Sequence, residues 1–120
     1  MEFQVKIRTK DGVGVVELIG EVDVFTTPKA KEAMLELIEQ GVVKIAINLE
    51  QTEYLDSTGL GALVGVLKRV REREGNVHLV NPTDRIRRVL EITGLVKVFT
   101  ISDSEEEAIK ALGQKEASGP

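Results

Sequence analysis

The sequence predicts a single α/β domain in which helices pack on a mixed β-sheet. Short stretches with strand-like alternation of apolar residues follow one another with longer stretches in which apolar residues recur every three or four positions. Strands that alternate with helices form largely parallel or mixed sheets with right-handed crossovers. The length of 120 residues, with 42% apolar and 30% charged residues, suits one globular domain.

The first two elements are predicted to be a β-hairpin. Apolar and polar residues alternate over residues 3–8, as in a strand with one face on a core. Asp11-Gly12 is typical of a tight turn between two strands. The second strand is expected over residues 13–19, antiparallel to the first, and residues 20–27 are expected to form a loop.

The first helix is predicted to begin at Thr27-Pro28, where a capping hydroxyl precedes a proline, and to end before Gly41. The apolar residues of its inward face are Ala30, Ala33, Met34, Leu37 and Ile38. A strand follows, and its core-facing residues are Val43, Ile45, Ile47 and Leu49. Ala46 lies on the other face of that strand.

The second helix is predicted to begin near Ser57 and to end at Gly75-Asn76. Its inward residues are Leu60, Leu63, Val64, Leu67 and Val70. Residues 77–80 form the next strand.

Asn81-Pro82-Thr83 leads into a third helix, for which Gly94 is the expected C-cap. Its inward residues are Ile86, Val89 and Leu90. A short strand is expected over residues 98–101. The last helix begins with a capping box from Ser104 to Glu107, and its inward residues are Ala108, Ile109 and Leu112.

The predicted order is therefore β-β-α-β-α-β-α-β-α, in one domain over residues 1–113. Residues 114–120 contain a single alanine as their apolar residue. Because such a segment has almost no surface to bury, it is expected to be a disordered tail.

Composition argues against several classes of function. Twenty acidic and sixteen basic residues give a net charge of −4, whereas nucleic-acid-binding proteins concentrate positive charge. The apolar stretches are far shorter than a membrane span, and the N-terminus lacks the pattern of a signal peptide. There is no cysteine for a disulfide or a cysteine-based metal site. We expect a cytoplasmic protein that binds neither nucleic acid nor membrane.

The most informative segment covers residues 54–61, where a strand meets the second helix. Asp56 and Ser57 are residue types that cap helix N-termini, and capping alone would explain them. Three glycines follow, each disfavouring helix by ~1 kcal/mol relative to alanine; they are Gly59, Gly61 and Gly65. They indicate either close packing of the helix on the sheet or docking of another molecule. A phosphate on Ser57 would lie where helix dipole and amides favour an anion.

Catalytic and cofactor chemistry is poorly supported. The glycine pattern is an unconvincing dinucleotide fingerprint, because it does not follow its strand directly and no acidic residue ends the next strand. The single histidine, His78, is expected within a strand rather than as a base for Ser57 or a zinc ligand. We therefore expect no catalytic residue, no cofactor and no metal.

Two motifs carry a resemblance to a known family. Asp56-Ser57-Thr58-Gly59-Leu60, with Gly20-Glu21-Val22-Asp23 about thirty-five residues earlier, resembles the motifs of the anti-sigma factor antagonists, the bacterial STAS-domain family. Asn81-Pro82 and Thr93-Gly94-Leu95 are also similar to that family. The resemblance extends over residues 3–112. The predicted hairpin would allow the loop at residues 20–23 to lie beside the start of the second helix.

The resemblance implies a switch function. An unphosphorylated antagonist of this family binds an anti-sigma factor, which is also an ATP-dependent serine kinase, and thereby frees the sigma factor for transcription. The kinase phosphorylates the serine that corresponds to Ser57 and so ends the complex. A metal-dependent phosphatase of the PP2C type reverses the modification. The partner-binding residues that the resemblance implies are Glu21, Asp23, Asp56, Thr58 and Gly59.

Other functions are open at this point. The same glycine-rich helix start could serve a small-ligand or nucleotide-binding STAS module. STAS domains also occur in stressosome-like scaffolds and as regulatory domains in lipid transport. Modification of Ser57 by a kinase would favour the switch over all of these.

Overall fold

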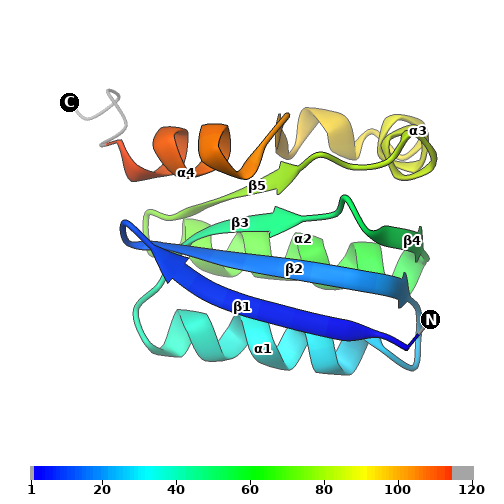
Figure 1. The fold of residues 1–120 in the computed structure, drawn as a ribbon, viewed down its shortest axis with the longest axis horizontal. Coiled ribbons are helices and arrows are strands. Elements are labelled where there is room, and N and C mark those ends of the chain that lie inside the picture. The colour runs from blue at the N-terminus through cyan, green and yellow to red at the C-terminus, as the bar shows by residue number, and fades with distance from the viewer. Residues whose placement is uncertain (1, 115–120) are drawn as a thin grey trace.

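The computed structural model describes residues 2–114, which form an α/β fold (Figure 1). The elements in chain order are β1 (Gln4–Lys10), β2 (Val13–Val22), α1 (Thr27–Glu39), β3 (Lys44–Asn48), β4 (Thr52–Leu55), α2 (Ser57–Arg71), β5 (Asn76–Val80), α3 (Asp84–Ile92), the 3₁₀ turn η1 (Leu95–Lys97), β6 (Thr100–Ser102) and α4 (Glu105–Gly113). The predicted α/β class is confirmed, and β4 is a strand additional to the predicted order.

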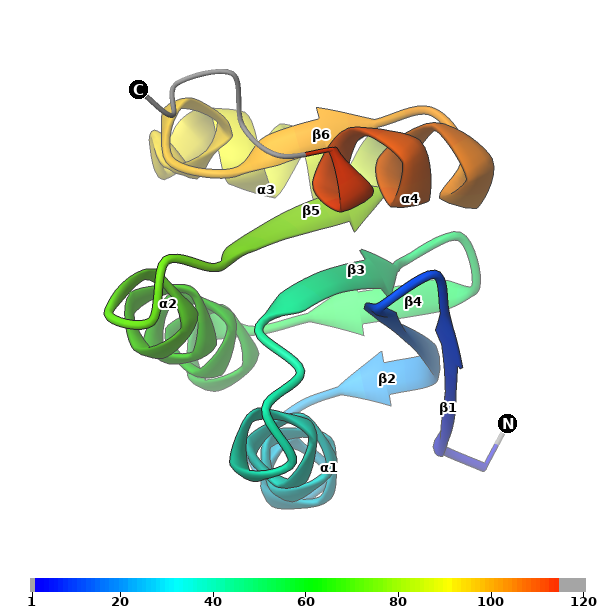
Figure 2. The same ribbon diagram turned by 90° about the vertical axis from the view of Figure 1, so that its left-hand side faces the viewer.

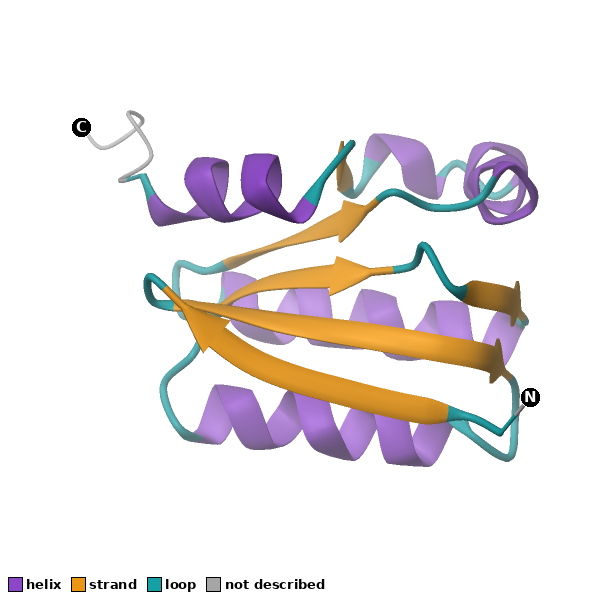
Figure 3. Cartoon of the chain, in the orientation of Figure 1, coloured by secondary structure: helices purple, strands orange, loops and turns teal. Residues whose placement is uncertain are grey.

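Within the described residues the strands form one six-stranded mixed sheet (Figure 3). The strand order is β1-β2-β3-β5-β6, and β4 pairs with β2 outside this path. β1 and β2 are antiparallel, and both residues of the turn between them, Asp11 and Gly12, have positive φ angles of 53° and 80°. This is the turn geometry that matches the twist of a hairpin, so the predicted hairpin is confirmed. All other strand pairs are parallel.

Helices cover both faces of the sheet. Figure 2 shows α1 and α2 together on one face and α4 on the other. The main core lies beneath α1, α2 and α3, and its fully buried side chains include Leu18, Met34, Ile47, Leu63, Leu79 and Leu90. The smaller core beneath α4 comprises Val13, Val15, Ala46, Val80, Ala108, Ile109 and Leu112. Ala46 therefore lies on the opposite face of β3 from the main core, as predicted.

β2 is longer than predicted. It continues to Val22, because its last residues pair with β4, a strand that is absent from the predicted order. The register shifts between Gly20 and Glu21, and Gly20 has a φ of 103°, which residues with a side chain rarely adopt. The paired residues are Gly20 with Thr52, Glu21 with Tyr54, and Val22 with Leu55. This pairing brings two distant segments of the chain to one end of the sheet.

The remaining differences are small. Val64, predicted on the inward face of the second helix, is half-buried and packs against the main core, whereas the buried Val66 was not predicted. The last strand begins at Thr100 rather than residue 98, because η1 follows Gly94 (φ 79°) and delays it. The last helix ends at Gly113, where the predicted domain ends. The predicted tail beyond residue 114 lies outside the described residues.

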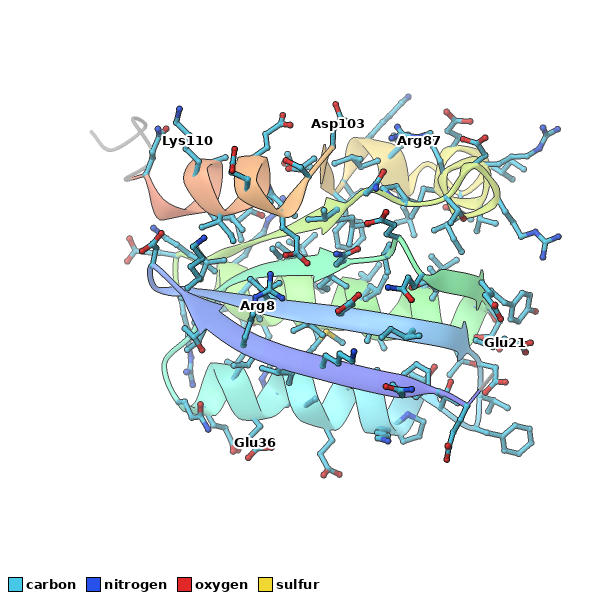
Figure 4. The ribbon with its side chains drawn as sticks, viewed as in Figure 1. Arg8, Glu21, Glu36, Arg87, Asp103 and Lys110 are labelled. Carbon is cyan, nitrogen blue, oxygen red and sulfur yellow. The ribbon has the colours of Figure 1, made fainter. Side chains whose placement is uncertain are left out.

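A polar cluster holds the start of α4 on the sheet. Glu105 accepts a hydrogen bond from Asn48 Nδ2 at 2.6 Å and forms an ion pair with Arg8 of β1 (Figure 4). Burial raises the pKa of Glu105, but the hydrogen bonds from Asn48 and Arg8 and the charges of Arg8 and Lys10 outweigh burial and hold the pKa below its ordinary value of 4.5. The carboxylate therefore stays ionised and keeps both partners.

Gly59 sets how closely α2 approaches the sheet. A Cβ atom at this position would lie 2.6 Å from Leu55 Cδ1 and 2.9 Å from Val22 Cγ1. A Cβ atom at Gly61 or Gly65 would meet nothing within 4 Å. Of the two explanations for the glycines, close packing on the sheet applies to Gly59, whereas the other two glycines face outward.

We expect Gly59→Ala and Gly61→Ala to change stability in opposite directions. Overpacking at Gly59 costs about 1–3 kcal/mol of unfolding free energy. At Gly61 the added methyl group meets no neighbour, and removing a flexible residue from a helix stabilises by about 0.5–1 kcal/mol. Urea unfolding of the two variants measures both effects. A Gly59→Ala variant as stable as Gly61→Ala would contradict the close approach.

Candidate functional site

Ser57 is the first residue of α2 and is exposed. The preceding residue, Asp56, has an extended backbone, and its Oδ1 accepts a hydrogen bond from the backbone nitrogen of Gly59 at 3.0 Å. Asp56 is therefore the N-cap of α2. Thr58 is also exposed. The capping interpretation thus applies to Asp56 and leaves Ser57 at the surface.

The end of β2 lies against this junction. The backbone nitrogen of Asp56 donates a hydrogen bond to the carbonyl oxygen of Val22 at 3.1 Å. Glu21 belongs to the ladder between β2 and β4, and Figure 4 shows it at the end of the sheet where β2 terminates. Glu21 and Asp23 therefore lie at the same end of the sheet as Ser57. The segment at residues 20–23 therefore lies beside the start of α2, as the predicted hairpin would allow.

Asp23 organises the turn that follows β2. Its Oδ1 accepts hydrogen bonds from the backbone nitrogens of Phe25 at 2.8 Å and Thr26 at 3.0 Å. Thr26 Oγ1 donates to the carbonyl oxygen of Glu21 at 2.8 Å and accepts from the backbone nitrogen of Asp23 at 2.9 Å. The backbone amides of Thr26 and Phe25 hold the pKa of the Asp23 carboxyl below its ordinary value of 3.8, because they stabilise the charged form. Residues 20–27 were expected to form a loop, and in the structure the Asp23 carboxylate fixes the turn within that segment.

The predicted cap of the first helix is wrong. Thr27 is the first helical residue and Pro28 the second, and Thr26 before them makes no side-chain capping bond. Within residues 2–114 the buried Oγ1 of Thr27 has no hydrogen-bond partner. Its backbone nitrogen instead donates to the carbonyl oxygen of Asp23 at 2.9 Å. The turn organised by Asp23 therefore takes the place of a hydroxyl cap.

Gly59 differs from the other predicted partner-binding residues. It is buried between α2 and the strand ends, whereas Glu21 and Thr58 are exposed and Asp23 and Asp56 are half-buried. Its contact with Val22 and Leu55 positions the helix start. Among the residues predicted for the site, Glu21, Ser57 and Thr58 are therefore the exposed ones.

Three apolar residues at this end of the sheet are exposed, and none of them was predicted as a site residue. The exposed fractions are 55% for Val24, 87% for Phe25 and 45% for Tyr54. Val24 and Phe25 lie in the turn after β2, and Tyr54 lies in β4, the strand that was not predicted. An aromatic residue within a short turn is the signal that could have identified Phe25.

The described residues offer little for metal or catalytic chemistry. Within residues 2–114 no three or more His, Asp or Glu side chains are grouped so that they could hold a metal ion. His78 is buried in β5, with Nδ1 3.0 Å from Ser102 Oγ. It alternates with residues of the main core and so faces α4, away from α2. In the described part of the chain, no helix has the length and apolar character that crossing a bilayer requires.

Comparison with known proteins supports the resemblance seen in the motifs. The STAS domain profile matches residues 4–108. The chain is 35% identical over 106 residues to an anti-sigma-B factor antagonist of Staphylococcus aureus, and the match covers 88% of this chain and 98% of that relative.

Solved structures agree with this assignment. A candidate anti-sigma factor antagonist of Thermotoga maritima has a TM-score of 0.86 and 27% identity, over 92% of this chain and 95% of that one. The Bacillus cell fate determinant SpoIIAA, in its phosphorylated form, has a TM-score of 0.72 and 28% identity, over 92% of this chain and 98% of that one. Both similarities extend across nearly the whole fold.

We expect the Asp23 carboxyl to titrate below pH 3.8 in the folded protein. Because the pKa of Asp23 is lowered on folding, its contribution to stability is complete above the unfolded-state value and is lost as pH falls through the folded-state value. NMR titration of the carboxyl carbon measures this pKa directly. Titration of Asp23 at or above pH 3.8 would contradict the hydrogen bonds described for the turn.

Proposed function

The chain belongs to the STAS domain family and, within it, to the anti-sigma factor antagonists, and we propose that phosphorylation of Ser57 switches its activity. In the unphosphorylated form it binds an anti-sigma factor serine kinase and so releases the sigma factor. The kinase modifies Ser57 and ends the complex, and a PP2C-type phosphatase restores the free serine. This cycle would operate in the cytoplasm.

The observation that carries the proposal is the exposed Ser57 at the N-terminus of α2. A kinase must reach the hydroxyl oxygen, and an exposed first helical residue is accessible without unfolding. The site also tolerates the product, because the positive end of the helix dipole favours an anion. The phosphorylated form of the Bacillus relative supports the same chemistry.

The proposed partner surface surrounds Ser57. Glu21 and Asp23 contribute from the end of β2, and Asp56 and Thr58 from the helix start. Gly59 contributes by holding α2 close to Val22. The name of the Staphylococcus aureus relative, an antagonist of an anti-sigma-B factor, supports a protein partner of this kind.

A regulatory role fits the site better than an enzymatic one. Activating a serine as a nucleophile requires a general base within hydrogen-bond reach. His78 is the chain's single histidine, and it is buried in β5 facing α4. Asp56, beside Ser57, already accepts the N-cap hydrogen bond of α2, and the Asp23 carboxylate accepts the backbone hydrogen bonds of its turn. This arrangement suits a substrate of a kinase.

We expect Ser57 to be the sole phosphoacceptor. Incubation with purified anti-sigma factor kinases and ATP should add one phosphate to the wild type and to Thr58→Ala, and none to Ser57→Ala. Intact mass counts the phosphates, and fragment mass spectrometry locates them. Thr58→Ala is the matched control, because Thr58 is equally exposed and adjacent. Phosphate on Thr58 in the wild type would refute the assignment, and nucleotide binding without modification would favour a ligand-binding module.

We expect the phosphate to block the interface and leave the fold unchanged. It adds about 1.5–2 negative charges. At a helix N-terminus this charge stabilises by about 0.3–1 kcal/mol. Beside Asp56, however, a partner would have to desolvate it, and burying an unpaired charge costs several kcal/mol.

The melting temperature should therefore stay equal or rise slightly on phosphorylation while affinity for the kinase falls by orders of magnitude. Amide spectra of the two forms should differ around residues 56–60 and at the end of β2. Shifts spread through the sheet, or a lower melting temperature, would point instead to a conformational mechanism.

A further inference from the structure

Exposed apolar side chains occur at the end of the sheet where Ser57 lies. In residues 2–114 the large apolar side chains that are exposed are Ile7, Val24, Phe25, Tyr54, Ile92 and Val98. Three of them, Val24, Phe25 and Tyr54, come from the end of β2 and from β4; we call these three the apolar tip. Phe25 is 87% exposed, the highest value among the six. Because the Phe25 side chain is not buried, it adds little to the stability of this fold and is available to contact another molecule.

The turn holds Phe25 in solvent. Its backbone nitrogen is bonded to Asp23 Oδ1 at 2.8 Å, and the next residue, Thr26, bonds both the same oxygen and the carbonyl oxygen of Glu21. The first amide of α1 closes the turn on the carbonyl oxygen of Asp23. The backbone on both sides of Phe25 is therefore fixed. An anchor that is already in place loses little conformational freedom on binding.

The surroundings of the apolar tip define the chemistry of its partner. Residues 21–28 and 50–67 contain no lysine or arginine, so their ionised groups are all carboxylates. Those nearest the tip in the chain are Glu21, Asp23, Glu53 and Asp56. Basic residues that border these segments include Lys29 in the first turn of α1 and Arg85 of α3, which lines a hollow with Thr52 and Glu53. Because carboxylates outnumber these two cations, the apolar tip fits an apolar pocket with a rim of lysine and arginine.

A second copy of this chain is a poor occupant. A twofold interface would bring the same acidic surface of both copies together, and like charges in contact oppose association. The occupant that fits is a different protein, and the position beside Ser57 identifies it as the kinase that modifies this serine. The apolar tip is near this serine because Asp56, the residue before Ser57, donates its backbone N–H to the carbonyl oxygen of Val22, three residues before Phe25.

We propose that Phe25 is the apolar anchor through which this chain docks on its kinase, and that Asp23 is the positioning residue that presents it. This inference rests on the proposed function. Aromatic residues at the centre of an interface carry a large share of binding energy. Asp23 then acts through the turn rather than by pairing with a cation of the partner.

The test compares Phe25→Ala with Ile92→Ala, a matched control that is 75% exposed at the end of α3 and outside the apolar tip. The probes are the purified anti-sigma factor kinases encoded in the genome that encodes this chain, each titrated calorimetrically against the full chain. Phe25→Ala should weaken binding about 30-fold or more at an unchanged melting temperature. Ile92→Ala should bind as the wild type does.

A double-mutant cycle tests the role of Asp23. If Asp23 acts by presenting Phe25, Asp23→Ala should weaken the wild type but weaken the Phe25→Ala variant no further. A further loss of the same size would show that Asp23 contacts the partner directly and would overturn its positioning role.

The outcomes separate the anchor from the proposed function. If the wild type is bound and phosphorylated but Phe25→Ala binds as tightly as Ile92→Ala, the anchor is wrong and the proposed function stands. If no kinase binds or modifies the wild type, both fail. A wild-type dimer in sedimentation that Phe25→Ala abolishes would assign the apolar tip to a second copy and overturn the inference.

Discussion

The pairing of β2 with two successive strands on one side controls the geometry of the candidate site. β2 pairs with β3 along residues 14–17 and, after the bulge at Gly20, with β4. The carbonyl oxygen of Val22 then accepts a hydrogen bond from the backbone nitrogen of Asp56. The side chain of Val22 occupies the space that a Cβ atom at Gly59 would need. One strand end thus positions both the acidic turn and the start of α2. β2 is buried on both faces, with Val16 and Leu18 in the main core and Val13 and Val15 in the core beneath α4. A slip by one residue would exchange the side chains of the two cores, so packing on both faces keeps this register in place.

Stability and recognition depend on different parts of the fold. The two cores and the polar cluster of Arg8, Asn48 and Glu105 lie along the sheet and beneath its helices. The end of the sheet at Ser57 presents exposed apolar side chains and carboxylates instead. Ser57 is exposed there, which is the basis for expecting that a phosphate on it would leave the fold unchanged. Asp23 links the two parts, because its carboxylate fixes the turn that presents the exposed side chains.

Periodic patterns made most elements predictable, and their absence explains the errors. The helices with long apolar stripes, α1 and α2, begin at the predicted residues because 3.6-residue repeats are strong signals. β4 has four residues, and its exposed Glu53 and Tyr54 stand between buried Thr52 and Leu55. Such a segment has no strand signal of its own. Its hydrogen-bond partner is β2, some thirty residues earlier, and Thr52 Oγ1 also bonds the carbonyl oxygen of Leu18 at 2.7 Å.

The sequence by itself determined the α/β class, the family and the position of Ser57 at the start of the second helix, because local motifs and periodicity encode all three. Only the tertiary structure decided which acidic residues surround Ser57, which glycine packs against the sheet and which side chains reach solvent. Gly59 and Gly61 look alike in the sequence, yet one touches Val22 and the other faces outward. Phe25 is apolar, yet the hydrogen bonds of Asp23 hold it in water. These outcomes depend on contacts between distant segments, which the order of residues along the chain does not display.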